Sequence, residues 1–245
     1  MCNRVMQVLF LSLLFTGAAF AQQWKWPDKS KNLTVLPPET TGESLRNTMV
    51  GFAQSLGVRC WYCHVGEEGK PLSSFDFVSD EKQTKETARL MLRMVKTINE
   101  SFISKMDKAE HLKVTCLTCH RGNFAPLMLE SVLQDTYREK GLSETIQQYR
   151  DLRTAYYGSF TYNFGEQTLL DVAGSMDDEK KIGDAIEILK LNLEFYPSSG
   201  MTAYQLGDAY EKLGNKADAI KQFEMAVQRM PKNPQAKKRL ESLKK

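Results

Sequence analysis

Histidine and cysteine are both scarce in this chain, which limits where its chemistry can lie. Its 245 residues include three histidines and five cysteines. Four of the cysteines fall in two short motifs, and the fifth, Cys2, lies in a segment that we expect to be removed, so none remains for a structural disulfide. The net charge is only +3, so the chain lacks the basic surface of a nucleic-acid-binding protein, and we expect no nucleic-acid partner.

Two of the three histidines directly follow closely spaced cysteine pairs. The sequence reads C-W-Y-C-H at residues 60–64 and C-L-T-C-H at residues 116–120. In a C-x-x-C-H motif, each thiol can add to one vinyl group of a porphyrin, and the histidine can ligate the iron. We therefore expect two covalently bound c-type haems and a role in carrying electrons. The residues concerned are Cys60, Cys63 and His64 at the first motif, and Cys116, Cys119 and His120 at the second.

A bare cysteine pair has other uses, which must be weighed against haem attachment. Redox dithiols, disulfides and zinc sites all use the C-x-x-C spacing. The two pairs together supply four sulfur atoms, which is enough for a tetrahedral zinc ion. That interpretation leaves His64 and His120 without a role, so we prefer haem attachment.

The N-terminal segment has the pattern of an export signal. Arg4 is the only charged side chain before Lys25, residues 5–20 are almost all apolar, and A-F-A at residues 19–21 fits the small-x-small cleavage pattern. We expect cleavage after Ala21 and a mature protein in the periplasm or outside the cell, where covalent haem attachment takes place in bacteria. The apolar run is short for a membrane span, so membrane association is expected only if this segment stays uncleaved.

A helix that carries a methionine is predicted just before the first motif. Thr40 and Glu43 have the spacing of a capping box, and Gly57 is placed to end the helix. One face of this helix comprises Leu45, Met49, Phe52 and Leu56. A helix that ends beside a haem lies along one face of the ring, so Met49 is a candidate for the sixth iron ligand, with core packing as its alternative role.

A second helix is predicted over about residues 82–103, before the second motif. Met91 and Met94 lie one turn apart on it, and Met106 follows its end, so spacing alone allows any of the three as the sixth ligand. His111 is the histidine outside the motifs. It is either a ligand of the other haem or a surface side chain.

Residues 32–126 resemble the cytochrome c subunit of photosynthetic reaction centres. The similar pieces are L-G-V-x-C-x-x-C-H at residues 56–64, the methionine helix around Arg93 and Met94, and V-T-C-x-T-C-H-R-G at residues 114–122. The resemblance implies helices that place a methionine before most attachment motifs as the sixth ligand.

The resemblance also bears on ligand choice and on haem number. Met49 lies eleven residues before Cys60, and Met94 lies twenty-two before Cys116. Both spacings are similar to those of the family, which favours Met94 over Met91. The family's type members carry four haems whereas this chain has motifs for two, so it looks like a reduced, diheme relative.

The last third of the chain repeats with a period of 34 residues. Ala185 and Pro197 each lie 34 residues before Ala219 and Pro231. The small, aromatic and proline positions match the tetratricopeptide pattern of paired helices. Repeat units of this kind cannot bury their apolar faces alone, so they stack. A weaker unit is expected at residues 166–199. We also expect helices over residues 142–156 and 233–243.

Five aromatic residues gather between the haem motifs and the repeats. We expect them to form core at the domain junction rather than a ligand site. They are Tyr156, Tyr157, Phe160, Tyr162 and Phe164.

The sequence thus predicts a mainly α protein, in which a small helical diheme cytochrome c domain precedes a tetratricopeptide-type α-solenoid. We divide it into a signal peptide (1–21), a diheme domain (22–128) and a helical linker with repeats (129–245). Redox proteins are the expected partners of the haem domain, and a protein partner or a second copy is expected for the repeats.

Electron transfer without enzymatic turnover is the leading interpretation, and two alternatives remain. In one, copies of the chain assemble through their repeats into a filament or array of haems. In the other, the chain is a peroxidase-type enzyme. That chemistry needs acid–base groups beside an open iron position. Asp76, Asp80 and Glu81 lie between the motifs, but they form no evident acid–base pair.

Overall fold

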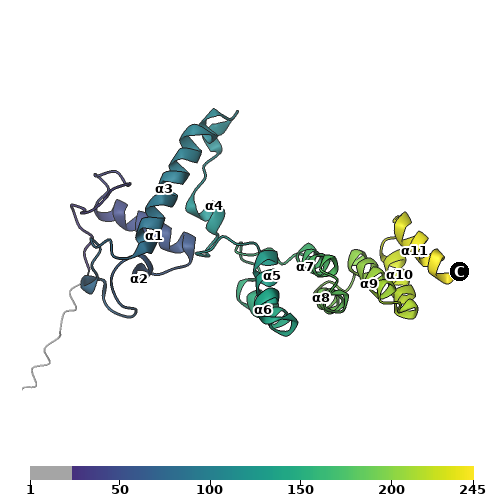
Figure 1. The fold of residues 1–245 in the computed structure, drawn as a ribbon. Coiled ribbons are helices and arrows are strands. Elements are labelled where there is room, and N and C mark those ends of the chain that lie inside the picture. The colour runs from purple at the N-terminus through teal and green to yellow at the C-terminus, as the bar shows by residue number, and fades with distance from the viewer. Residues whose placement is uncertain (1–23) are drawn as a thin grey trace, which may run out of the picture. The chain divides into compact units, whose positions relative to one another are not determined.

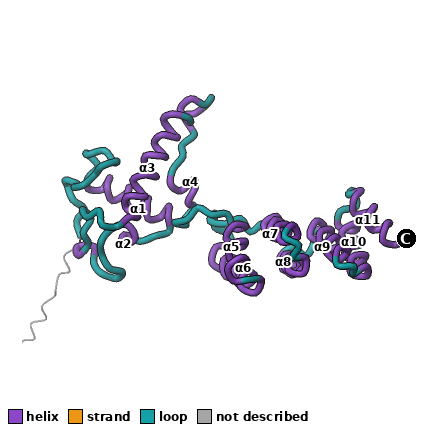
Figure 2. Tube along the Cα trace, viewed as in Figure 1, coloured by secondary structure: helices purple, strands orange, loops and turns teal. Residues whose placement is uncertain are grey.

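The computed structural model describes residues 24–245, and these residues are mainly helical. The expected signal segment, residues 1–21, lies outside the described residues. Figure 2 shows helices joined by loops, and the extended pairing among residues 24–245 is a single bridge between Val65 and Asp76. The predicted mainly α fold class is confirmed.

The helices follow one another along the described chain as shown in Figure 1. The α-helices are α1 (Gly42–Leu56), α2 (Cys60–Cys63), α3 (Gln83–Ser101), α4 (Cys116–His120), α5 (Leu129–Lys140), α6 (Leu142–Tyr156), α7 (Glu166–Asp178), α8 (Ile182–Phe195), α9 (Gly200–Lys212), α10 (Lys216–Arg229) and α11 (Pro234–Lys244). Short 3₁₀ helices span Leu72–Ser74, Ile103–Lys105 and Ala109–His111. The described chain divides into two compact units, one of residues 24–49 and 60–92 and the other of residues 50–59 and 93–245.

Helix α1 carries the apolar stripe that the sequence predicts. It begins at Gly42, two residues after the predicted capping residue Thr40. Leu45 is buried. The helix ends at Leu56 because Gly57 takes a φ of +66°, a left-handed conformation that costs glycine little.

The repeats begin with a helix pair that the sequence predicted only in part. Helix α6 has the predicted bounds, but α5 was not predicted. Leu129, Leu133 and Tyr137 are buried along one face of α5, at the spacing of successive helical turns. Gly141, with a φ of +85°, joins α5 to α6.

Helices α7 to α10 have the geometry of a 34-residue repeat. The starts of α7 and α9 are 34 residues apart, and so are the starts of α8 and α10. Each helix packs on its neighbours in sequence, which is the arrangement of an α-solenoid. Asn215 caps α10 by accepting a hydrogen bond from the Asp218 backbone N–H, and Asn233 caps α11 in the same way.

Most of the buried apolar side chains lie in this helical stack. The cluster that continues through α5 to α9 is formed by Leu129, Leu133, Tyr137, Tyr149, Phe164, Leu169, Leu170, Val172, Ala173, Met176, Ala185, Ile186, Ile188, Leu189, Leu191, Leu206 and Ala209. The predicted aromatic junction is partly core: Phe164 is buried, and Tyr156 and Tyr162 pack against the cluster. Phe160, by contrast, is 90% exposed.

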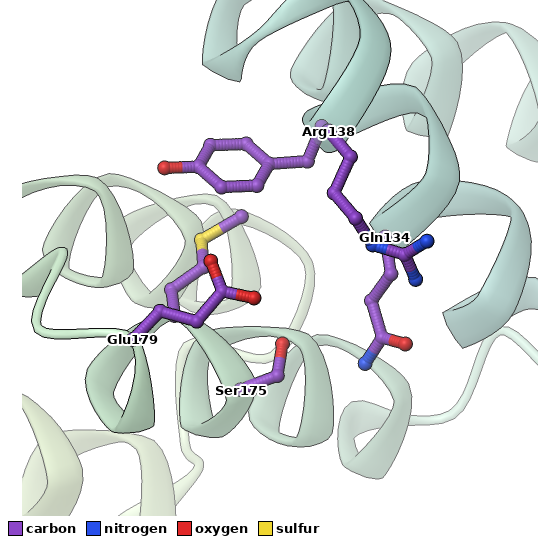
Figure 3. A pocket seen from close by; sticks show the side chains of 6 residues that line it. Gln134, Arg138, Ser175 and Glu179 are labelled. Atoms are coloured by element: carbon purple, nitrogen blue, oxygen red, sulfur yellow. The ribbon is translucent and has the colours of Figure 1, made fainter.

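A small cavity lies between α5 and α7. Figure 3 shows Gln134 and Arg138 of α5 facing Ser175 of α7 and Glu179, which directly follows α7. Its volume of about 70 Å³ suits one or two water molecules and is far too small for a porphyrin. The cavity therefore belongs to the packing of the repeats.

Candidate haem-attachment sites

The first attachment motif is itself a helical turn. Cys60 and Cys63 begin and end α2, and the His64 backbone N–H donates to the Cys60 carbonyl at 3.0 Å. Residues three and four positions apart lie on one side of a helix, so both thiols and the imidazole share a face. Cys60 is exposed and Cys63 is half-buried, and neither is in a disulfide.

Side chains just before α3 and in its first turn fix this turn. Lys82 Nζ donates to the Trp61 carbonyl, and Thr84 Oγ1 donates to the Tyr62 carbonyl at 2.6 Å. These are carbonyls of a short helix that lack partners within the helix itself. The motif is therefore held in place by its own unit.

His64 lies in an environment that keeps its imidazole neutral. Its ring contacts Phe77 edge-on, with 4.9 Å between ring centroids. Burial, together with the charges of Lys85 and Arg89, lowers the pKa of His64 to about 4. A neutral imidazole offers the lone pair that an iron ligand needs. Its Nδ1 is buried and meets no hydrogen-bond partner among the described residues.

The backbone at Phe77 contacts a cluster of charged side chains, formed by Lys85, Arg89 and Asp80, that the sequence did not predict. The Lys85 ammonium donates to three successive backbone carbonyls, those of residues 77–79, at 2.7 to 3.2 Å. Lys85 and Arg89 are both buried, and each lies 3.0 Å from Asp80. Hydrogen bonds from Arg89, Asn32 and Lys85 hold the pKa of Asp80 well below its usual range.

Two of the three acidic residues between the motifs, Asp76 and Asp80, are engaged in other contacts. Asp76 accepts hydrogen bonds from the backbone N–H groups of Val78 and Ser79, which lower its pKa. Asp80 is bound by the cation cluster. Both carboxylates are therefore ionised and weakly basic, a poor state for proton transfer near neutral pH.

The second attachment motif is the short helix α4. It begins after Thr115, whose backbone N–H donates to Thr118 Oγ1 at 3.0 Å. Arg121 and Gly122 end it with φ values of +51° and +83°. Burial raises the pKa of the Cys116 thiol, as it does for Cys63, so both are protonated at neutral pH.

His120 is oriented by the turn that follows it. Its Nδ1 lies 3.0 Å from the Asn123 carbonyl oxygen. Because a carbonyl only accepts, Nδ1 carries the proton and Nε2 keeps its lone pair. Histidines that ligate metals usually donate their other N–H in this way, which fixes the ring and its tautomer.

The turn is also held by the end of α1. The Gly122 N–H donates to the Ser55 carbonyl at 2.9 Å. A Cβ built on Gly57 would lie 2.1 Å from the Gly122 carbonyl oxygen, so the two backbones meet where no side chain fits. The contact therefore requires glycine at residue 57, and the φ of +83° at Gly122 favours glycine there for its own reason.

Helix α3 is tied to the chain that leads into the second motif. Asn99 accepts from the Val114 N–H at 2.9 Å and donates to the Val114 carbonyl at 2.8 Å. Of the candidate ligands, Met91 and Met94 are 38% and 45% exposed on α3, and Met106 is 53% exposed beyond its end. No geometry singles out one of them.

The other candidate ligands lie as follows. Met49 is half-buried on α1, in the same compact unit as His64. His111 is a surface side chain, 83% exposed, with its Nε2 3.7 Å from Glu110. The exposure of His111 agrees with the simpler of its two predicted roles.

The apolar side chains around the motifs also fit a large flat cofactor. Within residues 24–128, Leu45 is the buried apolar side chain, whereas the repeats hold a continuous core. Large apolar side chains are instead exposed there: Val50, Val78, Leu90, Met91, Met94, Phe102, Met106, Leu112, Leu117, Phe124, Leu127 and Met128. Exposed side chains of this size are available to pack against a flat cofactor. Free thiols, neutral histidine and exposed apolar surface are together what covalent haem requires.

Two features are absent from the part of the chain that the structure describes. Nowhere in residues 24–245 do three side chains of His, Cys, Asp or Glu converge as the ligands of one metal ion would. Among the helices of the same residues, none combines the length and apolarity that crossing a bilayer requires.

Two helical C-x-x-C-H turns with an oriented histidine define a c-type cytochrome, here joined to helical repeats. The chain belongs to the photosynthetic reaction centre cytochrome c subunit family, whose match covers residues 60–186, just over half of the chain. The predicted resemblance is confirmed. The match runs beyond residue 126, where the resemblance seen in the sequence ends, and continues through α5, α6 and α7 into α8.

Curated relatives agree with this assignment. Cytochrome c-554 of Chloroflexus aurantiacus is 33% identical over 114 residues, which are 46% of this chain and 24% of the relative. The photosynthetic reaction center cytochrome c subunit of Thermochromatium tepidum is 33% identical over 128 residues, 51% of this chain and 29% of the relative. The chain thus spans only 24% to 29% of the length of these relatives.

Solved structures similar to this chain are tetratricopeptide domains and secretion chaperones. The first TPR of Spaghetti (RPAP3), bound to an HSP90 peptide, is 18% identical and aligns over 47% of this chain and 87% of its own, with a TM-score of 0.35. PcrH from Pseudomonas aeruginosa is 11% identical over 48% of this chain and 89% of its own, with a TM-score of 0.34. The solenoid assignment rests on the helix packing of the chain itself.

Proposed function

We propose that this chain is an exported diheme c-type cytochrome that carries electrons, with helical repeats that dock it to a protein partner. Its domains are the predicted ones: residues 1–21 as signal peptide, 22–128 as the haem domain and 129–245 as the repeats. The observation that carries the proposal is the pair of C-x-x-C-H turns, in one of which His120 Nδ1 makes the kind of hydrogen bond that supports metal-ligating histidines.

Each motif residue has a role in holding haem. The thiol S–H of each cysteine would add across a vinyl group, with sulfur bound to one carbon and hydrogen to the other. Haem then supplies an iron that takes up and releases one electron. The thioethers would form at Cys60 and Cys63 for one group, and at Cys116 and Cys119 for the other.

Histidine and methionine would complete the coordination at each site. His64 and His120 would each hold one haem iron through the imidazole, and Met49 and Met94 would each supply a second protein ligand. An iron held by two protein side chains would leave no open site for a substrate, which favours electron transfer over catalysis. The lowered pKa values of Asp76 and Asp80 argue in the same direction, because neither acid holds a proton to give.

The repeats would bring the cytochrome to its partner. Helix pairs that stack in a solenoid offer an extended surface to another protein. The partner is a redox protein, or a second copy of the chain if the assembly interpretation holds. Size-exclusion chromatography of the holoprotein at high concentration separates these cases, since a strictly monomeric species contradicts self-assembly.

Absorption spectroscopy of the exported holoprotein tests the electron-carrier proposal. We expect low-spin, six-coordinate haem at neutral pH in the reduced protein, and two one-electron steps in a potentiometric titration. A high-spin fraction in the native protein at neutral pH, or turnover of peroxide that is lost on removing one axial histidine, would instead support the peroxidase-type alternative.

A further inference from the structure

The loop between α6 and α7 contacts the turn that follows the second motif. Thr161 Oγ1 donates to the Arg121 carbonyl at 2.9 Å. Asn123 Nδ2 donates to the Tyr162 hydroxyl at 2.6 Å. Thr161 is buried and Tyr162 is half-buried, so neither hydrogen bond is fully exposed to solvent.

The same Asn123 provides the carbonyl that orients His120. Its side chain is fixed at two atoms, since Nδ2 donates to Tyr162 and Oδ1 accepts from the Ala125 N–H at 3.2 Å. Its main-chain oxygen lies 3.0 Å from His120 Nδ1. Any movement of Asn123 therefore changes the hydrogen bond on the imidazole.

Tyr162 is in turn held by the core of the repeats. Its ring contacts Tyr156 edge-on at 5.5 Å and Phe164 at 6.3 Å between centroids. Phe164 is buried within the cluster of α5 to α9, against Tyr149. A continuous set of contacts thus runs from the repeat core through Tyr162 and Asn123 to His120.

We propose that Tyr162 and Thr161, supplied by the repeats, are positioning residues for the His120 ligand and thereby set the reduction potential of the second haem. This inference rests on the proposed haem attachment at Cys116 and Cys119. An imidazole that donates its Nδ1–H strongly is a better electron donor to iron, which stabilises the ferric state. Loosening Asn123 weakens that donation and raises the potential.

The environment of His64 makes the two sites unequal. Its Nδ1 has no acceptor among the described residues, and the ammonium of Lys85 lies on the backbone of Phe77, whose ring contacts the imidazole. An imidazole without an acceptor for its Nδ1–H is a weaker donor to iron, which favours ferrous iron. The second haem should therefore have the lower potential of the two, and it alone should respond to changes at Tyr162.

The test is a potentiometric titration of the full-length holoprotein carrying Y162F. This change removes one hydroxyl and keeps the ring. We expect the lower of the two potentials to rise, by about threefold to tenfold in the ferric–ferrous equilibrium, where tenfold is 59 mV for one electron. Y156F is the matched control, because it removes a hydroxyl from the same aromatic group without touching the hydrogen bond between Asn123 and Tyr162. It should leave both potentials unchanged.

Asn123→Ala provides a second route to the same loss, since it removes the amide and keeps the main-chain carbonyl. Y162F and N123A should shift the same potential, and the double variant should shift it no further than the larger single effect. Unchanged potentials in both single variants, or an equal shift in Y156F, would overturn the inference while two attached haems remain. A wild-type protein that carries no covalent haem would instead overturn the proposed function.

Discussion

Gly57→Ala should destabilise this protein strongly, because two effects add at that position. A non-glycine residue at a φ of +66° costs about 1–2 kcal/mol. The new Cβ would lie 2.1 Å from the Gly122 carbonyl oxygen, so a backbone must shift, at a further cost of about 1–3 kcal/mol. We expect a total loss of about 2–5 kcal/mol in the free energy of unfolding.

Two other glycines separate the causes of this loss. Gly69 has a φ of +77°, and a Cβ added there would have no atom within 4 Å, so Gly69→Ala should cost about 1–2 kcal/mol by strain alone. Gly51 lies inside α1 with the same open space, so Gly51→Ala should stabilise the protein by about 0.5–1 kcal/mol.

Denaturant unfolding of the holoproteins, followed by haem absorption and by far-UV circular dichroism, measures the series. Because Gly122 belongs to the turn after His120, Gly57→Ala should also alter the spectrum of one haem, whereas the other two variants should not. Equal costs for Gly57→Ala and Gly69→Ala would refute the close approach of residues 57 and 122.

Three further predictions follow from the ligands, the charge cluster and the repeat core. Met94→Leu should abolish the methionine–iron charge-transfer band of one ferric haem, whereas Met91→Leu should leave it; the reverse pattern would identify Met91 as the ligand. Folding lowers the pKa of Asp80, so its contribution to stability is present above its unfolded pKa of about 3.9 and is lost as the pH falls below that value. The difference in unfolding free energy between wild type and Asp80→Asn should therefore shrink from about pH 5 to pH 2. A difference that stays constant over this range would contradict the ion pairs of Asp80. Phe223→Ala, at a fully buried position of α10, should lower the free energy of unfolding in urea by about 3–5 kcal/mol without changing the haem number. Leu213→Ala, at a 54% exposed position, should change that free energy by no more than about 0.5 kcal/mol. Similar costs for both variants would argue against the repeat core.

Local patterns in the sequence predicted much of this structure. The attachment turns, the end of α1 at Gly57, the bounds of α6 and the 34-residue spacing of α7 to α10 all depend on residues close together in the chain. Helix α5 was missed although Leu129, Leu133 and Tyr137 have helical spacing, because its single short stripe lies between the second motif and the first clear repeat signal.

The contacts that define the sites could not be predicted in the same way. Asn123 and Tyr162 are 39 residues apart, and nothing in the local pattern of either indicates the other. Lys85 and Arg89 have the spacing of a solvated helix face, yet both are buried because carbonyls of residues 77–79 and the Asp80 carboxylate meet them. Charge burial of this kind depends on loop geometry that helical periodicity does not contain.

Neither the helical pattern nor the structure distinguishes the two candidate methionines on α3 as the sixth ligand. Met91 and Met94 are both exposed on α3, and their positions differ by less than one helical turn. Family spacing favours Met94, and the helix itself offers no contact that distinguishes the two. The leucine variants above are therefore the direct route to the ligand.

The intact mass of the exported protein tests the central claim most directly. The account predicts the polypeptide without residues 1–21 plus two haem groups that survive denaturation. Cys60→Ser with Cys63→Ser, and separately Cys116→Ser with Cys119→Ser, should each remove one of them. A mass equal to that of the bare polypeptide, with four free thiols or bound zinc, would contradict it.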